Sequence, residues 1–303
     1  MKDYLIHINN LFPIRRSAEE KARFADYVSA ELGEERTRVE TIDKNNNVVI
    51  GNVDIAKVIF TAHYDTPAAS PIPNLMIPAN KIKGTLIHVL FPLALALLSM
   101  LVALGAGKIF SLDNSVVIAI YIVLYFGVFF GSTRLIPNKH NKNDNTSGIA
   151  AVMSLAADYH GEKAAFILFD NEEKGLLGSK AFAKKYKDIL QDKLVINLDC
   201  VGNGDNMIFI VKDTVEKLSE YLLLCKALEE KDTNFAVHFI PFKKSGGNSD
   251  HKSFPVSVGV MAASNGRAVR FITGRIHTSR DTVASTENIE FLRGRLGKFI
   301  SCL

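Results

Sequence analysis

Cysteine is scarce in this sequence of 303 residues, and tryptophan is absent. The three cysteines are an odd number without CxxC spacing, which argues against a disulfide framework and against a zinc site built from cysteines. We therefore expect the protein to work in a reducing compartment. Residues 1–16 also lack the uninterrupted apolar stretch and the small-residue cleavage site of a secretory signal, so we expect them to remain in the mature protein.

A concentrated run of basic residues is also missing. The 36 Lys and Arg residues and the 32 Asp and Glu residues are spread along the chain, and the formal net charge is +4. Because nucleic-acid-binding proteins carry a dense basic patch, this distribution argues against a nucleic-acid partner. The hydrophobic content of 48% is high enough for a sizeable core and excludes a disordered chain.

Charge is absent altogether from two stretches, residues 85–107 and 114–133. A helix needs about 20 apolar residues to cross the hydrocarbon core of a bilayer, and both stretches are long enough. We predict a hairpin of two transmembrane helices, carried by an insertion at residues 71–140. The alternative is a pair of buried helices in a globular lid or an oligomer interface, which Pro92, His88 and several glycines favour.

Basic residues are distributed unevenly around this predicted hairpin. The link between its two helices contains only one basic residue, Lys108. Five basic residues lie outside the hairpin, namely Lys81, Lys83, Arg134, Lys139 and Lys142. Cytoplasmic segments of membrane proteins are enriched in Lys and Arg, so we expect the bulk of the protein to lie in the cytoplasm, with the lipid bilayer as a partner of the hairpin.

The rest of the chain alternates apolar runs with helical patterns. The apolar runs, typical of buried strands, are residues 57–61, 164–169, 194–198 and 256–263. The helical patterns are residues 17–32, 176–186 and 287–300, and a β-hairpin is expected from residues 38–42 and 48–50 around a polar turn at residues 44–47. This alternation predicts an α/β fold with a mainly parallel central sheet and helices on its faces, formed as one domain by residues 1–70 and 141–303.

Acidic residues and histidines follow the ends of these predicted strands. His63 and Asp65 follow the run at residues 57–61, Glu172 and Glu173 follow 164–169, and Asp199 follows 194–198. Further members of the set lie in other motifs: Asp144 opens DNTSG, Asp250 and His251 belong to SDH, and His277 lies in IHTSRDT. Ligands of open parallel sheets bind outside the carboxyl ends of the strands, so one cleft can collect most of these side chains. So many carboxylates in one cleft would repel one another unless cations lay among them.

Each of these side chains alone has a structural explanation. An aspartate before a helix, such as Asp144, is typically an N-cap, and Glu172 and Glu173 fit a solvated helix start. A lone histidine such as His63 or His277 is more often hydrogen-bonded than metal-bound. Together, however, two histidines and three carboxylates are a suitable set for two borderline divalent ions, because imidazole and carboxylate both bind zinc and one carboxylate can bridge.

Six motifs follow one another along the chain: AHYDTP, NDNTSG, NEEKGLLGS, NLDCVG, SDHKSF and IHTSRDT. This series resembles that of the co-catalytic zinc aminopeptidases, the family that also contains glutamate carboxypeptidase and the glutaminyl cyclases. Apart from the apolar insertion, the resemblance extends from about Lys57 to Thr282. It implies an α/β fold with a mixed central sheet between helices, and two zinc ions as cofactors, with cobalt and manganese as alternatives.

The resemblance also implies the ligands of the two ions. Asp144 would bridge them. His63 and Asp199 would complete one site, and Glu173 and His277 would complete the other. Together with the predicted hairpin, this implies a membrane-tethered zinc-dependent exopeptidase, with an aminopeptidase as the first candidate.

Two further acidic residues have implied roles without binding metal. Asp65 would orient the His63 imidazole, as carboxylates commonly do for zinc-bound histidines. Glu172 would act as the general base that takes a proton from the attacking water and passes it to the leaving amine. Asp250 and His251 either support the metal ligands from behind, contact the substrate or cap a helix.

Three alternatives to an aminopeptidase stay open. A carboxypeptidase would need cations for a terminal carboxylate, and four arginines lie around His277, although they also fit a solvated edge. They are Arg267, Arg270, Arg275 and Arg280. A glutaminyl cyclase would transfer an amine within one peptide, but cyclases of the animal type place tryptophans around their pocket. A non-catalytic membrane scaffold would be expected to lose ligands or Glu172, and none is missing.

Overall fold

The computed structural model describes residues 3–70, 74–134, 136–229, 234–267 and 269–303. The strands are β1 (Thr37–Ile42), β2 (Asn45–Ile50), β3 (Val58–His63), β4 (Asn74–Met76), β5 (Ala164–Phe169), β6 (Leu194–Leu198), β7 (Asn206–Val211), β8 (Ala236–Pro241), β9 (Ser257–Ala263) and β10 (Thr273–Ile276). The α-helices are α1 (Tyr4–Leu11), α2 (Ala18–Leu32), α3 (Lys81–Phe110), α4 (Asn114–Arg134), α5 (Gly148–Asp158), α6 (Leu177–Lys185), α7 (Ser219–Leu228) and α8 (Thr286–Ser301). We call α3, α4 and their link the hairpin, and the rest of the described chain the body.

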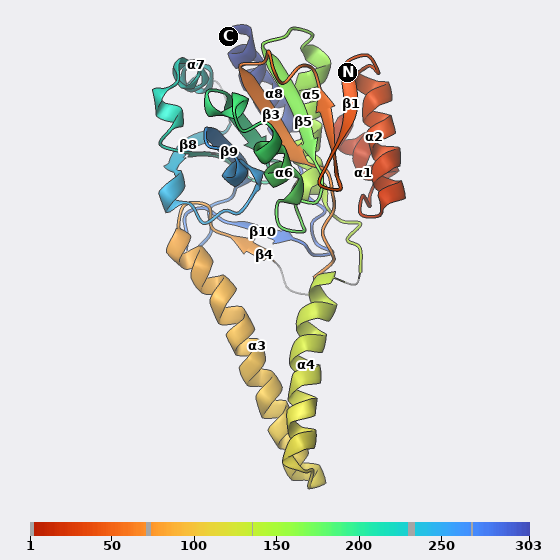
Figure 1. The fold of residues 1–303 in the computed structure, drawn as a ribbon. Coiled ribbons are helices and arrows are strands. Elements are labelled where there is room, and N and C mark those ends of the chain that lie inside the picture. Colours follow the sequence, from red (N-terminus) through yellow and green to blue (C-terminus); the bar gives the residue numbers. More distant parts are fainter. Residues whose placement is uncertain (1–2, 71–73, 135, 230–233, 268) are drawn as a thin grey trace.

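An eight-stranded sheet forms the centre of the body, in the order β1-β2-β5-β3-β6-β9-β7-β8. Its central strands β5, β3, β6 and β9 run parallel, whereas β1, β2 and β7 bring in antiparallel pairs. Helices cover both faces of the sheet (Figure 1). The predicted α/β fold with a mixed, mainly parallel sheet is therefore confirmed.

The central strands are buried on both faces, as their mainly apolar runs predict. Successive residues of β3 face opposite sides of the sheet. Phe60 packs against Phe299 of α8 in the larger core cluster, and Ile59 belongs to a second cluster that includes Phe182 of α6. This double-sided core holds the carboxyl ends of the parallel strands in one fixed row.

Two local predictions meet different outcomes. The α2 helix begins as expected, because the Ser17 side chain accepts the N–H of Glu20 and the Glu20 side chain accepts the N–H of Ser17. The polar turn expected at residues 44–47 is wrong. The β1–β2 turn consists of Asp43 and Lys44, both with positive φ, and the asparagines that follow belong to β2. Asn47 accepts the N–H of Asp170 and donates to Gly178, and these contacts keep its polar side chain in a strand.

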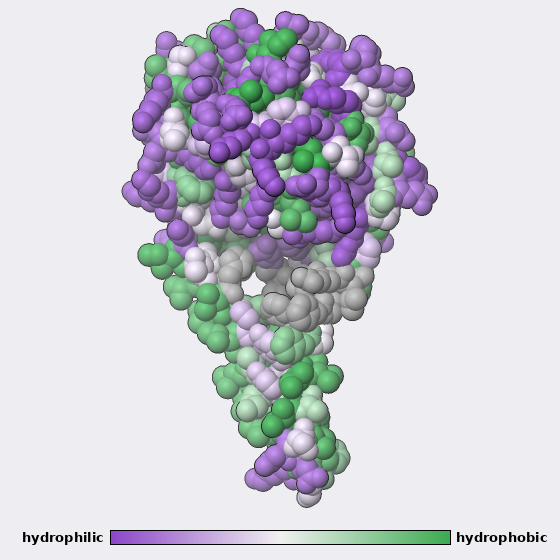
Figure 2. All heavy atoms as spheres, in the orientation of Figure 1, coloured by the Kyte–Doolittle hydropathy of each residue, from purple (hydrophilic) through white to green (hydrophobic). Residues whose placement is uncertain are grey.

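The hairpin extends away from the body and its two helices converge at their link (Figure 1). Large apolar side chains cover its surface, in contrast to the mostly hydrophilic body (Figure 2). They include Leu90, Leu93, Leu97, Leu98, Leu101, Leu104, Ile118 and Val123. Among the described residues, α3 is the one helix long and apolar enough to cross a membrane, and the apolar part of α4 that the structure describes, Asn114–Val128, is shorter. Both helices extend beyond the predicted 85–107 and 114–133.

Candidate metal centre

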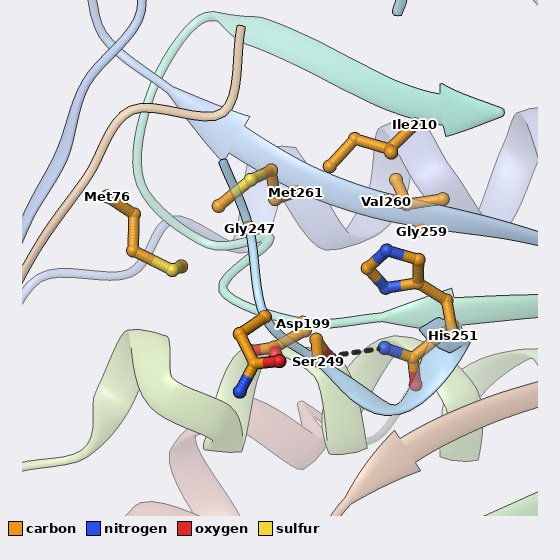
Figure 3. Close-up of a pocket in the computed structure, with 11 residues that line it drawn as sticks. Met76, Asp199, Ile210, Gly247, Ser249, His251, Gly259, Val260 and Met261 are labelled. Carbon is orange, nitrogen blue, oxygen red and sulfur yellow. Dashed lines mark hydrogen bonds between the residues drawn. The ribbon is translucent and has the colours of Figure 1, made fainter. Parts of the chain in front are cut away.

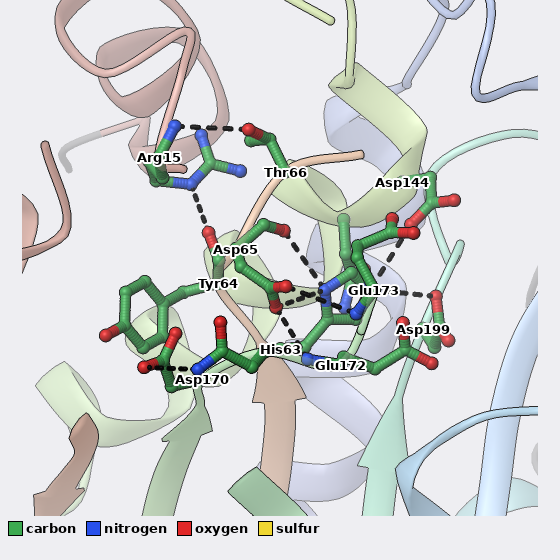
Figure 4. Close-up of polar contacts among 12 residues, drawn as sticks. Arg15, His63, Tyr64, Asp65, Thr66, Asp144, Asp170, Glu172, Glu173 and Asp199 are labelled. Carbon is green, nitrogen blue, oxygen red and sulfur yellow. Dashed lines mark hydrogen bonds and ion pairs between the residues drawn. The ribbon is translucent and has the colours of Figure 1, made fainter. Parts of the chain in front are cut away.

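The predicted site residues come together at the carboxyl edge of the central strands, where ligands of such sheets bind. His63 is the last residue of β3, Asp199 follows β6, and the two adjacent glutamates follow β5. Asp144 lies in the turn before α5, and His277 directly follows β10. Figure 4 shows how most of these side chains converge.

Asp144 lies between two groups of potential ligands. Its Oδ1 is 3.2 Å from His63 Nε2, and its Oδ2 is 3.0 Å from His277 Nε2. On the first side Asp199 Oδ1 is 3.8 Å from His63 Nε2, and on the second Glu173 Oε1 is 3.4 Å from His277 Nε2. Each side thus combines one imidazole, one carboxylate of its own and one oxygen of Asp144, and the ligand atoms of each side lie within 4.8 Å of one another.

The arrangement leaves acceptor atoms without donors. Asp199 Oδ1 and Glu173 Oε1 are buried, and neither accepts a hydrogen bond from the part of the chain that the structure describes. Buried carboxylate oxygens without partners are costly, and a divalent cation bound by imidazole and carboxylate would satisfy both. The donor set therefore fits zinc on each side of Asp144.

The electrostatics of the cluster indicate the same need for cations. Burial raises the pKa of the Glu172 carboxyl well above its ordinary value; the nearby His63 opposes this shift, and Glu173 and Asp250 add to it. Burial alone would lower the pKa of His63, but Glu172 and Asp144 outweigh it and raise that pKa well above its usual range. Acids that retain protons and imidazoles that gain them are the response of a site with excess negative charge.

Asp65 connects the end of β3 to the two glutamates. Its Oδ1 is 3.5 Å from His63 Nδ1 and accepts the backbone N–H of Glu172 at 2.9 Å. Its other oxygen accepts the N–H of Glu173 at 3.2 Å (Figure 4). His63 Nδ1 also lies 3.2 Å from the backbone carbonyl oxygen of Asp65. Asp65 therefore contacts the imidazole ring through its backbone and its carboxylate, and its carboxylate also holds the turn that presents the glutamates, a contact that the sequence did not predict.

Asp144 is not a helix cap, although an aspartate before a helix commonly is. The N–H of Gly148 at the start of α5 is accepted by Asn145 Oδ1 instead, and the Asn145 amide donates to the carbonyl of Leu198. Asp281 accepts the backbone N–H groups of Asn143 and Asp144, each at 3.0 Å. These contacts leave the Asp144 carboxylate directed at the histidines.

Sequence reasoning missed two contributors to this geometry. Asp281 belongs to the IHTSRDT motif, and this position is a sequence signal for a residue near the site. Its contact with the backbone of Asp144, 137 residues away, has no such signal. Arg15 had no signal. It is fully buried and donates to the carbonyl of Tyr64, to Asn141 and to Thr146, so it ties the N-terminal segment to both loops that carry the site (Figure 4).

Asp250 and His251 lie within a short 3₁₀ turn, Asp250–Ser253, and neither side chain caps a helix. Both side chains are buried. His251 lines a small cavity beside Asp199, with a volume of about 20 Å³ (Figure 3). The pair therefore lies behind the metal-ligand cluster rather than on the protein surface.

Fold and site together define a mixed α/β protein with a buried set of potential metal ligands at the carboxyl edge of its sheet. The sequence profile of peptidase family M28 matches residues 137–293, more than half of the chain. The chain belongs to peptidase family M28, and the enzyme is a metallopeptidase. This confirms the family resemblance of the six motifs, although the matched region does not include AHYDTP.

Solved structures share the fold at low sequence identity. The LapA aminopeptidase of Legionella pneumophila has a TM-score of 0.55 at 15% identity, over 98% of this chain and 69% of its own. The glutaminyl cyclase of Porphyromonas gingivalis has a TM-score of 0.56 at 14% identity, over 98% of this chain and 95% of its own. No curated protein matches the chain.

Proposed function

We propose that the protein is a zinc aminopeptidase with two ions on either side of Asp144. His63 and Asp199 would hold one ion, and Glu173 and His277 would hold the other. The observation that carries this proposal is the division of the cluster by Asp144, whose two oxygens face different histidines at 3.2 and 3.0 Å. The unpartnered oxygens of Asp199 and Glu173 support it on either side.

Glu172 is the proposed general base. Bound zinc would supply Lewis acidity and lower the pKa of water. Glu172 would accept a proton from the attacking water and donate it to the leaving amine. Its backbone is held by Asp65, and its carboxyl has a pKa well above the ordinary value because of burial and the neighbouring acids.

The cavity beside Asp199 supports a preference for small apolar side chains. Met76, Ile210 and Met261 line it together with Asn197 and His251 (Figure 3). Its volume of about 20 Å³ is that of roughly one water molecule. Methionine side chains adapt easily, so a short apolar residue of the substrate could enter by displacing Met76 or Met261.

We also propose that the hairpin crosses a membrane, as an insertion at residues 71–140 in a catalytic domain formed by residues 1–70 and 141–303. The exposed apolar side chains of α3 and α4 support this, as do the flanking basic residues, which favour a cytoplasmic body. The insertion begins and ends at the site. Ser70 donates its N–H to the carbonyl of His277, and β4 pairs with β10 just before His277. Substrates would then reach the metal centre close to the bilayer surface.

Peptide hydrolysis with defined polarity tests the main proposal. Purified protein would be assayed with peptides that have free or acetylated N-termini and free or amidated C-termini, with and without a chelator. We expect release of the N-terminal residue only where the α-amine is free, loss of activity with the chelator and recovery with zinc. Release from acetylated peptides, with none from amidated ones, would instead identify a carboxypeptidase.

A glutaminyl cyclase is the second candidate, because the cyclase of Porphyromonas gingivalis shares this fold over 95% of its chain. Peptides with N-terminal glutamine distinguish the two reactions. A cyclase would release ammonia and leave the peptide bond intact, whereas an aminopeptidase would release free glutamine. Zinc content adds a second measure, since close to two ions per chain is expected for the proposed centre and none for a non-catalytic scaffold.

A further inference from the structure

A second cavity, of about 520 Å³, lies at the foot of α3, apart from the metal centre. The lining residues that matter here are Lys83, His238, Phe239, Lys244, Arg270 and Phe271. None of the described residues that line it is acidic. Three cationic side chains around one hollow, without a carboxylate in its wall, form a site for an anion.

The Phe271 ring stacks with one of the cationic groups of this cavity. The Arg270 guanidinium lies 4.9 Å from the centre of the Phe271 ring, and the His238 ring lies 4.7 Å from it. His238 Nε2 is 3.0 Å from Asn206 Oδ1, and this contact with the neighbouring strand β7 holds the imidazole in place. This stacking holds the Arg270 guanidinium at the cavity wall, and a guanidinium in such a position can bind a phosphate oxygen through its edge.

The opposite wall is formed by the start of α3. Asn80 caps this helix by accepting the N–H of Lys83. Gly246, close to Lys244, packs so tightly here that an added Cβ would lie 2.9 Å from the carbonyl oxygen of Ile77. The segment that carries Lys244 and the first turn of α3 therefore have a fixed separation.

The position of this cavity relates it to the bilayer. Figure 1 shows the end of β8 directly beside the start of α3, where the hairpin leaves the body. At this level the surface changes from hydrophilic to apolar (Figure 2). If α3 enters the bilayer at its first apolar turns, the cavity lies at the depth of the lipid headgroups.

We propose that this cavity binds the phosphate-bearing headgroup of an anionic phospholipid and so fixes the body against the membrane. The proposal rests on the membrane insertion of the hairpin, and it adds a specific lipid to it. A free phosphate shares the headgroup's charge chemistry, but the apolar helix that forms one wall would also contact acyl chains, which only a lipid provides. The volume exceeds that of a phosphate and suits a larger headgroup.

The absence of tryptophan from the chain provides a probe. Val269 lines the cavity and is half-buried, so Val269→Trp introduces a single tryptophan at its wall. The full chain with this substitution would be placed in phosphatidylcholine vesicles with brominated phosphatidylglycerol or, at the same mole fraction, brominated phosphatidylcholine. We expect stronger quenching by the brominated anionic lipid.

Two further variants on the same background test the cations. Lys244→Gln and Arg270→Gln should each lower the relative association constant for phosphatidylglycerol about fivefold, since each basic group near a membrane surface attracts anionic lipid. Lys243→Gln is the matched control, because Lys243 pairs with Asp213 and does not line the cavity. It removes the same charge and should leave the lipid preference unchanged. Hydrolysis of a soluble peptide should change in none of the three.

The quenching results distinguish the headgroup site from the membrane insertion of the hairpin and from the aminopeptidase activity. Equal quenching by the two lipids, or a preference that Lys244→Gln and Arg270→Gln leave intact, overturns the headgroup site while the hairpin stays in the membrane. Relief of quenching by millimolar inorganic phosphate overturns the lipid as the ligand. Absence of quenching by both lipids overturns the membrane insertion and this proposal with it, whereas the peptide assays judge the aminopeptidase separately.

Discussion

The central strands of the body bury every one of their side chains, whereas the hairpin exposes leucine, isoleucine, valine and phenylalanine along most of its length. Both regions are made from the same kinds of residue. In the body, helices on both sides of the sheet remove these side chains from water. In the hairpin the described part of the body supplies no such cover.

Where the two hairpin helices touch, small residues lie between them. Ala103 is fully buried, Ser99 is 5% exposed, and Gly107 packs against Val117 so closely that a Cβ would lie 2.5 Å from a methyl carbon. Close approach through small residues is typical of helix pairs in lipid, where van der Waals packing rather than the hydrophobic effect holds helices together. The body, by contrast, packs large aromatic side chains such as Phe60 against Phe166.

The largest effect is expected at the polar edge of the body, from substitutions of the adjacent glutamates. Glu172→Gln should lower kcat/KM by about 10² to 10⁴, the usual contribution of a general base, and leave the zinc content unchanged. Glu173→Gln should lower both kcat/KM and the zinc content, because it removes a proposed ligand. Zinc analysis alongside peptide hydrolysis checks this, and a Glu172→Gln enzyme with near-normal turnover would contradict the assigned base.

Truncation of one apolar residue in each region tests the comparison directly. Phe166→Ala removes a fully buried ring of β5 and should lower the free energy of unfolding by about 3–5 kcal/mol. Leu101→Ala removes a side chain that is 58% exposed and should change the body's stability by less than about 0.5 kcal/mol. Urea unfolding in detergent, followed by circular dichroism, measures both. Equal losses would mean that the hairpin packs into the body.

Sequence patterns predicted the parts of the fold that long apolar runs define. Strands β3, β5, β6 and β9 are buried on both faces, and most of their residues are apolar. The edge strand β8 is mostly exposed or half-buried and contains His238, and β10 contains Gly274 and the exposed Arg275, so neither has such a run. The run MIFIV in β7 carries the same signal as the central strands, but no strand was predicted there.

The site was predictable where its residues are strand-end acids and histidines, because strand order brings these to one edge. The residues that support it were not. Arg15 and Asp281 act on backbone groups far away in the sequence, and no local spacing encodes such a contact. The same applies to the second glutamate contact of Asp65, which depends on how the turn after β5 folds back toward β3.

An arginine placed in the hairpin and one placed on the body surface test whether the hairpin lies in a bilayer. Leu101→Arg should impair membrane integration by about 2.5–3.5 kcal/mol, the cost of an arginine at the centre of a transmembrane helix. Leu222→Arg is the matched control, because Leu222 is 63% exposed on α7 of the body. Vesicle flotation of the two variants measures integration. If Leu101→Arg floats as well as the control, the hairpin is a lid or an interface between copies of the chain.

The smallest effect is expected at Asp281, which holds the site without being one of its proposed ligands. Asp281→Asn keeps one acceptor oxygen but loses the charge that receives the N–H groups of Asn143 and Asp144. Partners of metal ligands typically contribute 10–100-fold to metal affinity, so zinc binding should weaken by about that factor. Competition with a fluorescent chelator measures the Kd, and Asp158→Asn, which removes a surface carboxylate paired with Arg293, serves as the control. Unchanged affinity in Asp281→Asn would show that the turn before α5 holds Asp144 in place without it, through Asn145 and its contact with β6.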